Sequence, residues 1–222
     1  MTTYDWLALP GIPAGSGAWE KLPVRTQDYL GLETDVSRKD WHLDSFVAEI
    51  LPAYDHNTIL IGQDLGGVLA SMATLQQKPK AVVLTGTALG SWWYWTRLSA
   101  KSPFHLFFYH TFKGNLFTQL GGGTNTRKHF SGHPHQSNPE GMRRLATHMR
   151  PPKGLAQHLT QQCPVFLIWG QREVFYPLFT AKRLAKQTNA PLFLNRGGHY
   201  CMWTHHQEFK GAMKQIENLL HR

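Results

Sequence analysis

An aspartate occupies a position from which its carboxylate could attack a substrate. Asp64 follows the apolar run of residues 59–61 and precedes residues 68–75, whose spacing is helical. One glycine lies two residues before Asp64, and two more lie two and three residues after it. This G-x-nucleophile-x-G spacing is typical of a sharp strand-to-helix turn that presents a reactive side chain, because neighbouring backbone passes too close for a Cβ. The same position would also suit a carboxylate that only caps the helix.

An acid and a histidine follow Asp64 along the chain. Glu173 comes soon after the apolar run of residues 165–169, and His199 comes soon after a further apolar run. Glu140 is the only other Asp or Glu between Asp64 and His199, so Glu173 has few competitors as the acid. A histidine that is oriented by a carboxylate can act as a general base. The order nucleophile, acid, histidine therefore favours a catalytic role for Asp64 over helix capping.

These residues resemble the α/β-hydrolase family, whose catalytic groups occur in this chain order. Residues 6–13 are similar to the family's loop that supplies a second oxyanion donor, although Pro10 stands where that loop usually has a histidine. The resemblance implies an oxyanion hole made by the backbone N–H groups of Leu65 and Ile12. It covers nearly the whole chain, which starts at what would be the third strand of the full fold.

Short apolar runs bounded by turn residues alternate with stretches of helical spacing, and this pattern predicts an α/β fold. The runs are residues 6–9, 29–32, 59–61, 81–84, 165–169 and 191–194. Helical spacing is clearest between residues 41 and 51 and between residues 209 and 220. We therefore expect a mostly parallel sheet of about six strands with helices on both faces, because crossover connections place helices there.

A segment rich in aromatic residues interrupts this alternation. Residues 89–159 contain no strand-like run in the expected place, and we interpret them as an inserted helical lid. The hydrolase core would then consist of residues 1–88 and 160–222. Most of the aromatic side chains are expected to pack the lid onto the core. A few are expected to line the substrate pocket, and the candidates are Trp93, Tyr94 and Tyr109.

An aspartate at this turn changes the expected reaction. Most relatives carry serine there, and aspartate resembles the epoxide hydrolases and the dehalogenases of the α/β-hydrolase fold. An aspartate is already anionic at neutral pH and is a good nucleophile toward an sp³ carbon that bears a strained or halide leaving group. The resemblance implies an alkyl-enzyme ester on Asp64. His199, oriented by Glu173, would then deprotonate the water that hydrolyses this ester.

The choice between the two substrates depends on two positions near Asp64. Dehalogenases of this family hold the halide with N–H donors where this chain has Leu65 and Ile12, which counts against a carbon–halogen substrate. Epoxide hydrolases use lid tyrosines to protonate the opening oxygen, and Tyr94 or Tyr109 could do so here. The sequence therefore favours an epoxide and leaves the halide open.

The charge of the chain is concentrated in one segment. The chain carries a formal net charge of +9, and residues 65–172 contain twelve Lys or Arg but one acid, Glu140. Such a field attracts anionic partners, although the charge would also serve solubility alone. An alternative function is therefore a carboxylic ester or thioester hydrolase that acts on an acidic or carrier-protein-bound acyl substrate. A second alternative is a binding protein that kept the fold and lost the chemistry.

The remaining features favour a cytoplasmic enzyme with a small-molecule substrate and no cofactor. The N-terminus has no signal-peptide pattern, and no apolar stretch reaches the length of a membrane span. Cys163 and Cys201 form no disulfide framework, and Cys201 is expected to be a core thiol. Histidines 129, 133 and 135 lack partners at ligand spacing, so no metal is expected. Neither a phosphate-binding loop nor a nucleic-acid-binding signature occurs.

Overall fold

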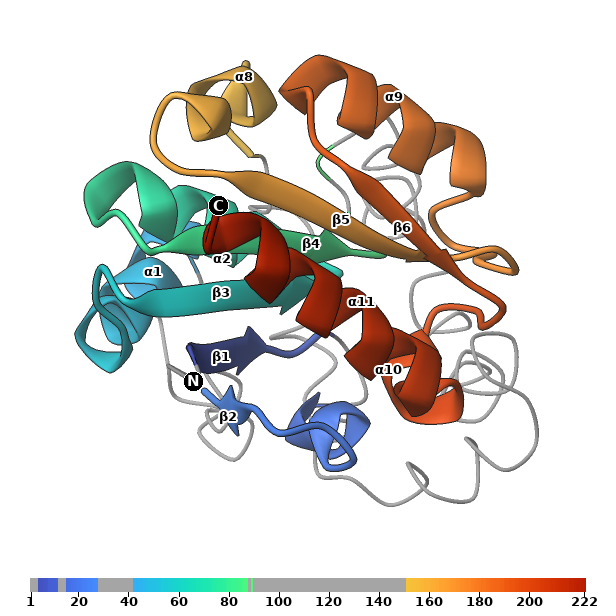
Figure 1. The fold of residues 1–222 in the computed structure, drawn as a ribbon. Coiled ribbons are helices and arrows are strands. Elements are labelled where there is room, and N and C mark those ends of the chain that lie inside the picture. The colour runs from blue at the N-terminus through green and yellow to red at the C-terminus, as the bar shows by residue number, and fades with distance from the viewer. Residues whose placement is uncertain (1–3, 12–14, 28–41, 88, 90–150) are drawn as a thin grey trace, which may run out of the picture.

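A six-stranded parallel sheet forms the centre of the molecule (Figure 1). The computed structural model describes residues 4–11, 15–27, 42–87, 89 and 151–222. The strands in sheet order are β2 (Arg25–Thr26), β1 (Asp5–Leu9), β3 (Thr58–Gln63), β4 (Ala81–Thr85), β5 (Val165–Gly170) and β6 (Leu192–Asn195). Every neighbouring pair is parallel. The predicted α/β architecture, a parallel sheet of six strands with helices, is therefore confirmed.

Helices cover both faces of the sheet (Figure 1). One face carries α1 (Leu43–Ile50), α2 (Leu65–Gln76), α8 (Leu155–Thr160) and α9 (Leu178–Thr188), with the short η2 (Leu51–Ala53) after α1. The other face carries η1 (Gly15–Trp19), α10 (Cys201–Thr204) and α11 (His206–Leu220). Because right-handed crossovers place helices on both sides of a parallel sheet, the central strands are shielded from solvent on both faces.

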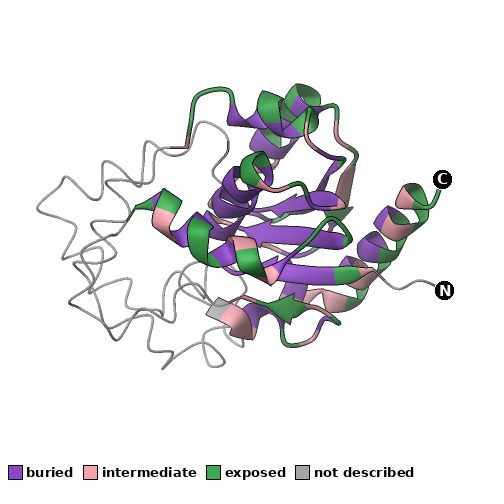
Figure 2. Ribbon diagram, turned by 90° about the vertical axis from the view of Figure 1, so that its left-hand side faces the viewer, coloured by how far each residue is buried: buried purple, intermediate pink, exposed green. Residues whose placement is uncertain are grey.

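The strand β3 shows how the sequence divides its side chains between the two faces. Successive side chains of a strand point to opposite sides. Leu60 accordingly packs with the α1 and α2 face, whereas Ile59 and Ile61 pack with the α11 face, and all three are fully buried. Burying a side chain of this size contributes about 1.5–3 kcal/mol. The buried sheet between its two helical layers is visible in Figure 2.

The helix α11 is amphipathic and closes one face of the sheet. Phe209, Met213 and Ile216 are buried against the strands, at the helical spacing seen in the sequence. Glu208, beside Phe209, is half-buried and accepts hydrogen bonds from Arg196, which directly follows β6. The predicted C-terminal helix is thus confirmed.

The C-terminal end of α2 is fixed by a tyrosine of the preceding connection. The hydroxyl of Tyr54 donates to the backbone oxygen of Gln77, at 2.7 Å, and the Gln77 side-chain amide donates to the backbone oxygen of Tyr54. This pair lies at the opposite end of α2 from Asp64, because Asp64 directly precedes the helix.

Two expectations fall partly outside the described residues. The predicted strand at residues 29–32 lies outside them, and the observed edge strand is instead β2, which pairs with β1. Most of the predicted lid also lies outside them, so the lid stays a prediction. Its last residues belong to α8, whose Leu155 and Leu159 are buried in the core cluster that contains α2. Among the helices that the structure describes, none has the length and apolar character of a membrane span.

Candidate active site

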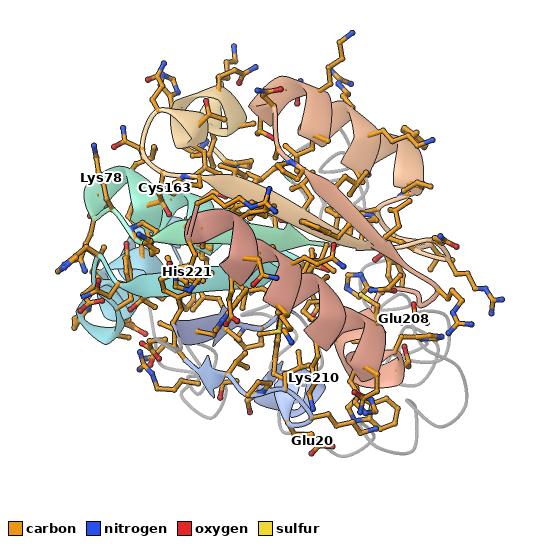
Figure 3. The ribbon with its side chains drawn as sticks, viewed as in Figure 1. Glu20, Lys78, Cys163, Glu208, Lys210 and His221 are labelled. Carbon is orange, nitrogen blue, oxygen red and sulfur yellow. The ribbon has the colours of Figure 1, made fainter. Side chains whose placement is uncertain are left out.

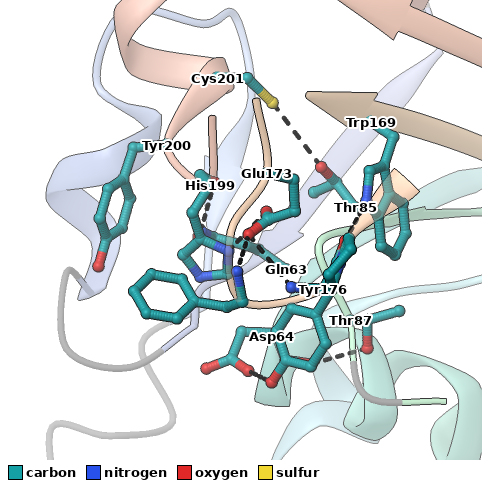
Figure 4. Close-up of polar contacts among 12 residues, drawn as sticks. Gln63, Asp64, Thr85, Thr87, Trp169, Glu173, Tyr176, His199, Tyr200 and Cys201 are labelled. Carbon is teal, nitrogen blue, oxygen red and sulfur yellow. Dashed lines mark hydrogen bonds and ion pairs between the residues drawn. The ribbon is translucent and has the colours of Figure 1, made fainter. Parts of the chain in front are cut away.

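The carboxyl ends of four strands meet at one edge of the sheet, and each carries a residue of the candidate site (Figure 4). Asp64 follows β3, Thr87 follows β4, Glu173 follows β5 and His199 follows β6. In open parallel sheets, ligands bind outside the carboxyl ends of the strands. The parallel arrangement thus brings together residues that lie far apart in the sequence.

Asp64 lies on a strained turn between β3 and α2. Its φ and ψ are 51° and −116°, outside the regions that L residues prefer, which costs on the order of 1–3 kcal/mol. Its N–H donates to the backbone oxygens of Thr85 and Gly86, at 3.3 and 3.1 Å. Its own backbone oxygen accepts the hydroxyl of Thr87 at 2.8 Å. The loop after β4 therefore holds the strained turn in place.

The glycines of the motif permit close contact between the turn and its neighbours. A Cβ on Gly62 would lie 2.4 Å from the backbone oxygen of Gly66. A Cβ on Gly66 would lie 2.0 Å from the backbone oxygen of Leu9. Both contacts are with backbone, which cannot move aside as a flexible side chain can. Glycine is therefore required at both positions, as the sequence motif indicates.

The side chain of Asp64 does not cap α2. All residues of α2 are described, and none of its N–H groups donates to the Asp64 carboxylate. Instead, Oδ1 accepts a hydrogen bond from the hydroxyl of Tyr176, and the Asp64 side chain is only half-buried at the edge of the sheet. The helix-capping alternative is therefore wrong.

His199 and Glu173 form a buried ion-pair contact. Nδ1 of His199 lies 2.8 Å from Oε2 of Glu173, and the two side chains are 3% and 1% exposed. The other Glu173 oxygen, Oε1, accepts the backbone N–H groups of Phe175 and Tyr176, at 2.8 and 3.3 Å. Since the carboxylate can only accept, Nδ1 of His199 carries the proton, and Nε2 is the nitrogen that can act as a base.

Burial and the neighbouring charges have opposite effects on the pKa of His199. Burial of the ring lowers the pKa of His199, whereas the charge and hydrogen bond of Glu173 and the charge of Asp64 raise it. The net result is a pKa above the ordinary histidine value. The Asp64 carboxylate is thus close enough to act on the histidine electrostatically.

The backbone and ring of His199 are fixed from several sides. The buried side-chain amide of Gln63 donates to the His199 backbone oxygen at 3.0 Å. Phe175 and Tyr200 contact the His199 ring edge-on, with centroid separations of 5.0 and 5.1 Å, and Tyr176 lies 5.9 Å away. Because Gln63 directly precedes Asp64, β3 positions both the aspartate and the histidine.

Tyr176 is a site residue that the sequence reasoning missed. Its hydroxyl donates to Oδ1 of Asp64, and its N–H donates to Glu173 (Figure 4). Burial, together with the charges of Asp64 and Glu173, raises the pKa of Tyr176 well above its ordinary value, so its hydroxyl keeps its proton. Its place three residues after the acid, in the same loop, was the signal available in the sequence.

The sequence matches the model of the alpha/beta hydrolase family over residues 6–212. The chain belongs to the alpha/beta hydrolase family. The sequence predicted that the chain belongs to this superfamily and is a hydrolase, and both predictions are confirmed at the level of the family. No curated protein sequence matches the chain.

Several solved structures share the alpha/beta hydrolase fold with this chain. A bromoperoxidase from Bacillus anthracis is 16% identical, with a TM-score of 0.74 over 97% of this chain and 92% of that chain. MenH from S. aureus is also 16% identical, with a TM-score of 0.74 over 100% and 96%. A loop variant of the haloalkane dehalogenase DbeA from Bradyrhizobium elkanii is 15% identical, with a TM-score of 0.68 over 99% and 90%. At these identities the likeness shows the fold alone.

Of the two residues expected to form the oxyanion hole, Leu65 lies within the described residues and Ile12 does not. Leu65 is the first residue of α2, and the first N–H groups of a helix have no partner within it. Ile12 lies outside the described residues, but the loop before it is placed. A Cβ on Gly11 would lie 2.6 Å from the Asp64 Cβ and 3.4 Å from Oδ2. This loop therefore passes directly beside the Asp64 carboxylate.

The predicted substrate-binding residues Trp93, Tyr94 and Tyr109 lie outside the described residues. Cys201 is buried beside Thr85, and burial chiefly raises the pKa of its thiol to about 11. A thiol that remains protonated at neutral pH is a poor nucleophile. This environment agrees with the expectation of a core thiol.

Proposed function

We propose that Asp64 is the nucleophile of a hydrolase that forms an alkyl-enzyme ester and then hydrolyses it. The observation that carries this proposal is the position of the Asp64 carboxylate, on a strained turn beside the buried His199–Glu173 pair and without a capping contact to α2. Backbone strain that the surrounding structure holds in place is typical of functional sites. Asp64, His199 and Glu173 would then act as nucleophile, base and orienting acid.

The first step is attack of the Asp64 carboxylate on an sp³ carbon. For an epoxide, a carboxylate oxygen–carbon bond forms while a ring carbon–oxygen bond breaks, and the ring oxygen takes up a proton. Tyr94 and Tyr109 of the predicted lid are the expected proton donors. The carboxylate needs no base for this step, because its reference pKa of about 3.9 leaves it ionised at neutral pH.

The second step is hydrolysis of the ester on Asp64. His199 takes a proton from a water molecule through Nε2, and the resulting hydroxide adds to the Asp64 carboxyl carbon. Glu173 stabilises the imidazolium that forms. Collapse of the intermediate releases the alcohol, which takes the proton back from His199. We place epoxides before halides because Leu65 and Ile12 supply no side-chain N–H donor for a halide ion.

A His199→Gln variant tests the covalent step. Without the base, the first step should proceed and the second should stop, so an alkyl-enzyme should accumulate. Intact-protein mass spectrometry should show a gain equal to the epoxide mass, and peptide mapping should place it on Asp64. The matched control is His158→Gln, because His158 is exposed on α8, away from the site. It should turn over like the unsubstituted protein and carry no adduct.

Heavy-oxygen water distinguishes this route from direct attack by water. A single turnover should place the heavy oxygen in the Asp64 carboxylate, while the product takes its oxygen from the enzyme. Heavy oxygen that appears only in the product, with no adduct in His199→Gln, would contradict a covalent Asp64 intermediate.

The excess of lysine and arginine over acidic residues in residues 65–172 supports a second candidate function. This candidate is an ester or thioester hydrolase for an acidic or carrier-bound acyl substrate. A carboxylate is a poor nucleophile toward an acyl carbon, because attack would give an anhydride. For this candidate, Asp64→Ser should raise hydrolysis of acyl esters. For the alkyl-enzyme route, the same substitution should abolish epoxide turnover.

A further inference from the structure

Polar residues end three strands on the face of the sheet that carries α10 and α11. Because side chains alternate along a strand, Gln63 lies on the same face as Ile61, two residues before it. The same alternation places Thr85 of β4 and Asn195 of β6 on this face. All three polar side chains belong to residues that are at most 2% exposed. The sheet therefore ends in a buried polar layer, next to the loop that carries His199.

The histidine loop, residues 196–200, is hydrogen-bonded to this layer. The Asn195 side chain accepts the N–H of Gly197 at 2.8 Å. The side-chain amide of Gln63 donates to the backbone oxygen of His199 at 3.0 Å (Figure 4). The strands β6 and β3 therefore hold the loop at two points, one before the histidine and one at the histidine itself.

The hydrogen bond from Gln63 fixes a position more than it stabilises the fold. Among the described residues, no other group donates to the His199 backbone oxygen. The other amide atom of Gln63, Oε1, is buried and has no hydrogen-bond partner among these residues. The contact thus satisfies one buried acceptor and leaves another unpaired, so its net contribution to the free energy of folding is small. What it supplies is a fixed place for the His199 backbone relative to β3.

Gln63 is also the residue that directly precedes the nucleophile. Through one hydrogen bond, the neighbour of Asp64 sets the place of His199, although Gln63 and His199 lie 136 positions apart. Glu173 holds the other end of the histidine, by its contact with Nδ1 at 2.8 Å. A histidine held at its backbone and at Nδ1 presents Nε2 in one place relative to Asp64.

We propose that Gln63 is a positioning residue, whose amide sets the distance between the His199 base and the ester on Asp64. The inference rests on the proposed alkyl-enzyme route, because this ester is the group that the activated water attacks. In that step a water molecule must fit between Nε2 and the carboxyl carbon, and a misplacement of about 1 Å costs on the order of 10²-fold in rate. The first step, attack by the carboxylate, needs no base and does not depend on this distance.

Gln63→Met separates the two chemical steps. Methionine matches the length of glutamine but cannot donate. In rapid-quench mass spectrometry with styrene oxide, a small uncharged epoxide, as the probe, adduct formation should stay within about threefold of the unsubstituted rate. Adduct hydrolysis should fall by about 10–10²-fold, so the adduct should accumulate although His199 is intact. The urea midpoint should change little, because one unpaired buried acceptor replaces another.

Two further measurements distinguish positioning from a merely structural role. Gln63→Glu should restore hydrolysis to within about threefold at neutral pH, because a carboxyl at this buried position keeps its proton and can donate to the same oxygen. The pH midpoint of adduct hydrolysis should be the same in Gln63→Met as in the unsubstituted protein, since Glu173 still contacts Nδ1 of His199.

Gln77→Met is the matched control. The Gln77 side-chain amide also donates to a backbone oxygen, that of Tyr54, but at the end of α2 opposite Asp64. The substitution removes the same kind of hydrogen bond away from the site. It should leave adduct formation and adduct hydrolysis unchanged.

The outcomes distinguish this inference from the proposed function. An adduct in His199→Gln together with unchanged hydrolysis in Gln63→Met would overturn the role of Gln63 and leave the alkyl-enzyme route standing. A parallel loss of both rates in Gln63→Met, with a lower urea midpoint, would do likewise, since Gln63 would then only support the fold. Hydrolysis in Gln63→Glu as slow as in Gln63→Met would also overturn it, because the donor would not be the cause. Absence of an adduct in His199→Gln and in Gln63→Met would overturn both proposals.

Discussion

Glu173 fixes the tautomer of His199 and makes its ring a stronger base. The buried carboxylate fixes the proton on Nδ1 and raises the pKa of the ring, whereas burial alone would lower it. His199 must be neutral to accept a proton from water. The rate of ester hydrolysis should therefore rise with pH, and because Asp64 is uncharged in the ester, the charge and hydrogen bond of Glu173 then oppose burial in setting the midpoint.

Glu173→Gln should move this midpoint and lower the rate. The substitution removes the charge that raises the His199 pKa and leaves the burial that lowers it, so the ascending limb should shift to lower pH. The plateau rate should fall by about 10²–10⁴-fold, because the ring is no longer held in one tautomer with a stabilised charge. The measurement is the pH dependence of adduct hydrolysis in single turnovers.

The matched control for this substitution is Glu208→Gln. Glu208 also pairs with a basic side chain, that of Arg196, but the pair is exposed and lies outside the site. Its pH profile should match that of the unsubstituted protein. A Glu173→Gln profile with an unshifted limb would show that another group sets the observed pKa.

At the scale of elements, the turn between β3 and α2 depends on close backbone contact. A Cβ at Gly66 would lie 2.0 Å from the Leu9 backbone oxygen, so Gly66→Ala requires β1 and α2 to separate. Overpacking of this kind costs about 1–3 kcal/mol. We therefore expect a lower free energy of unfolding and a loss of activity, since the same contact positions Asp64. Urea unfolding followed by circular dichroism measures the first effect.

Gly211→Ala is the matched control for Gly66→Ala. Gly211 lies inside α11, and a Cβ there would meet no atom within 4 Å. Alanine in a helix interior is favoured over glycine by about 0.5–1 kcal/mol. The two substitutions should therefore change stability in opposite directions. Similar stabilisation by both would mean that helix propensity, not the contact with Leu9, decides the effect at Gly66.

Hydrophobic periodicity predicted the elements that bury a complete face. β3, β4 and β5 are confirmed within one or two residues of the predicted runs, because strands covered on both sides consist almost entirely of apolar residues. The edge strand β2 was not predicted. It has two residues, both exposed, and it is defined by its pairing with β1 and not by an apolar pattern.

The site was predicted where a residue occupies a recognisable motif or chain order, as Asp64 does. Tyr176 was missed because its partner is an atom 112 positions away, and its place three residues after Glu173 does not by itself indicate a contact with Asp64. The donation from Gln63 to the backbone of His199 was missed for the same reason, since the two lie 136 positions apart. Contacts of this kind are created by the arrangement of parallel strands and cannot be deduced from local spacing.

At the scale of the whole molecule, four of the twelve bases of residues 65–172 lie among the described residues, and one of them, Lys153, is exposed shortly before α8. Lys78 and Lys80 lie in the connection before β4, at the sheet edge opposite Asp64, and Figure 3 shows Lys78 on the outer surface. Arg172 is exposed directly beside the acid Glu173. The other eight bases of residues 65–172 lie outside the described residues. The proposal that this charge recruits anionic substrates therefore needs a functional test.

Salt dependence provides that test because screening acts on charged substrates alone. The two probes are one epoxide scaffold that carries either a carboxylate or a neutral amide. If the basic segment steers the substrate, kcat/KM for the carboxylate should fall about fivefold or more between 10 mM and 500 mM salt, as the Debye length shortens from roughly 30 Å to below 8 Å. The neutral amide should change by less than about twofold, which controls for effects of salt on the enzyme itself. An equal, small response of both probes would leave the charge as a contributor to solubility, and the acidic-substrate alternative would then lose its main support.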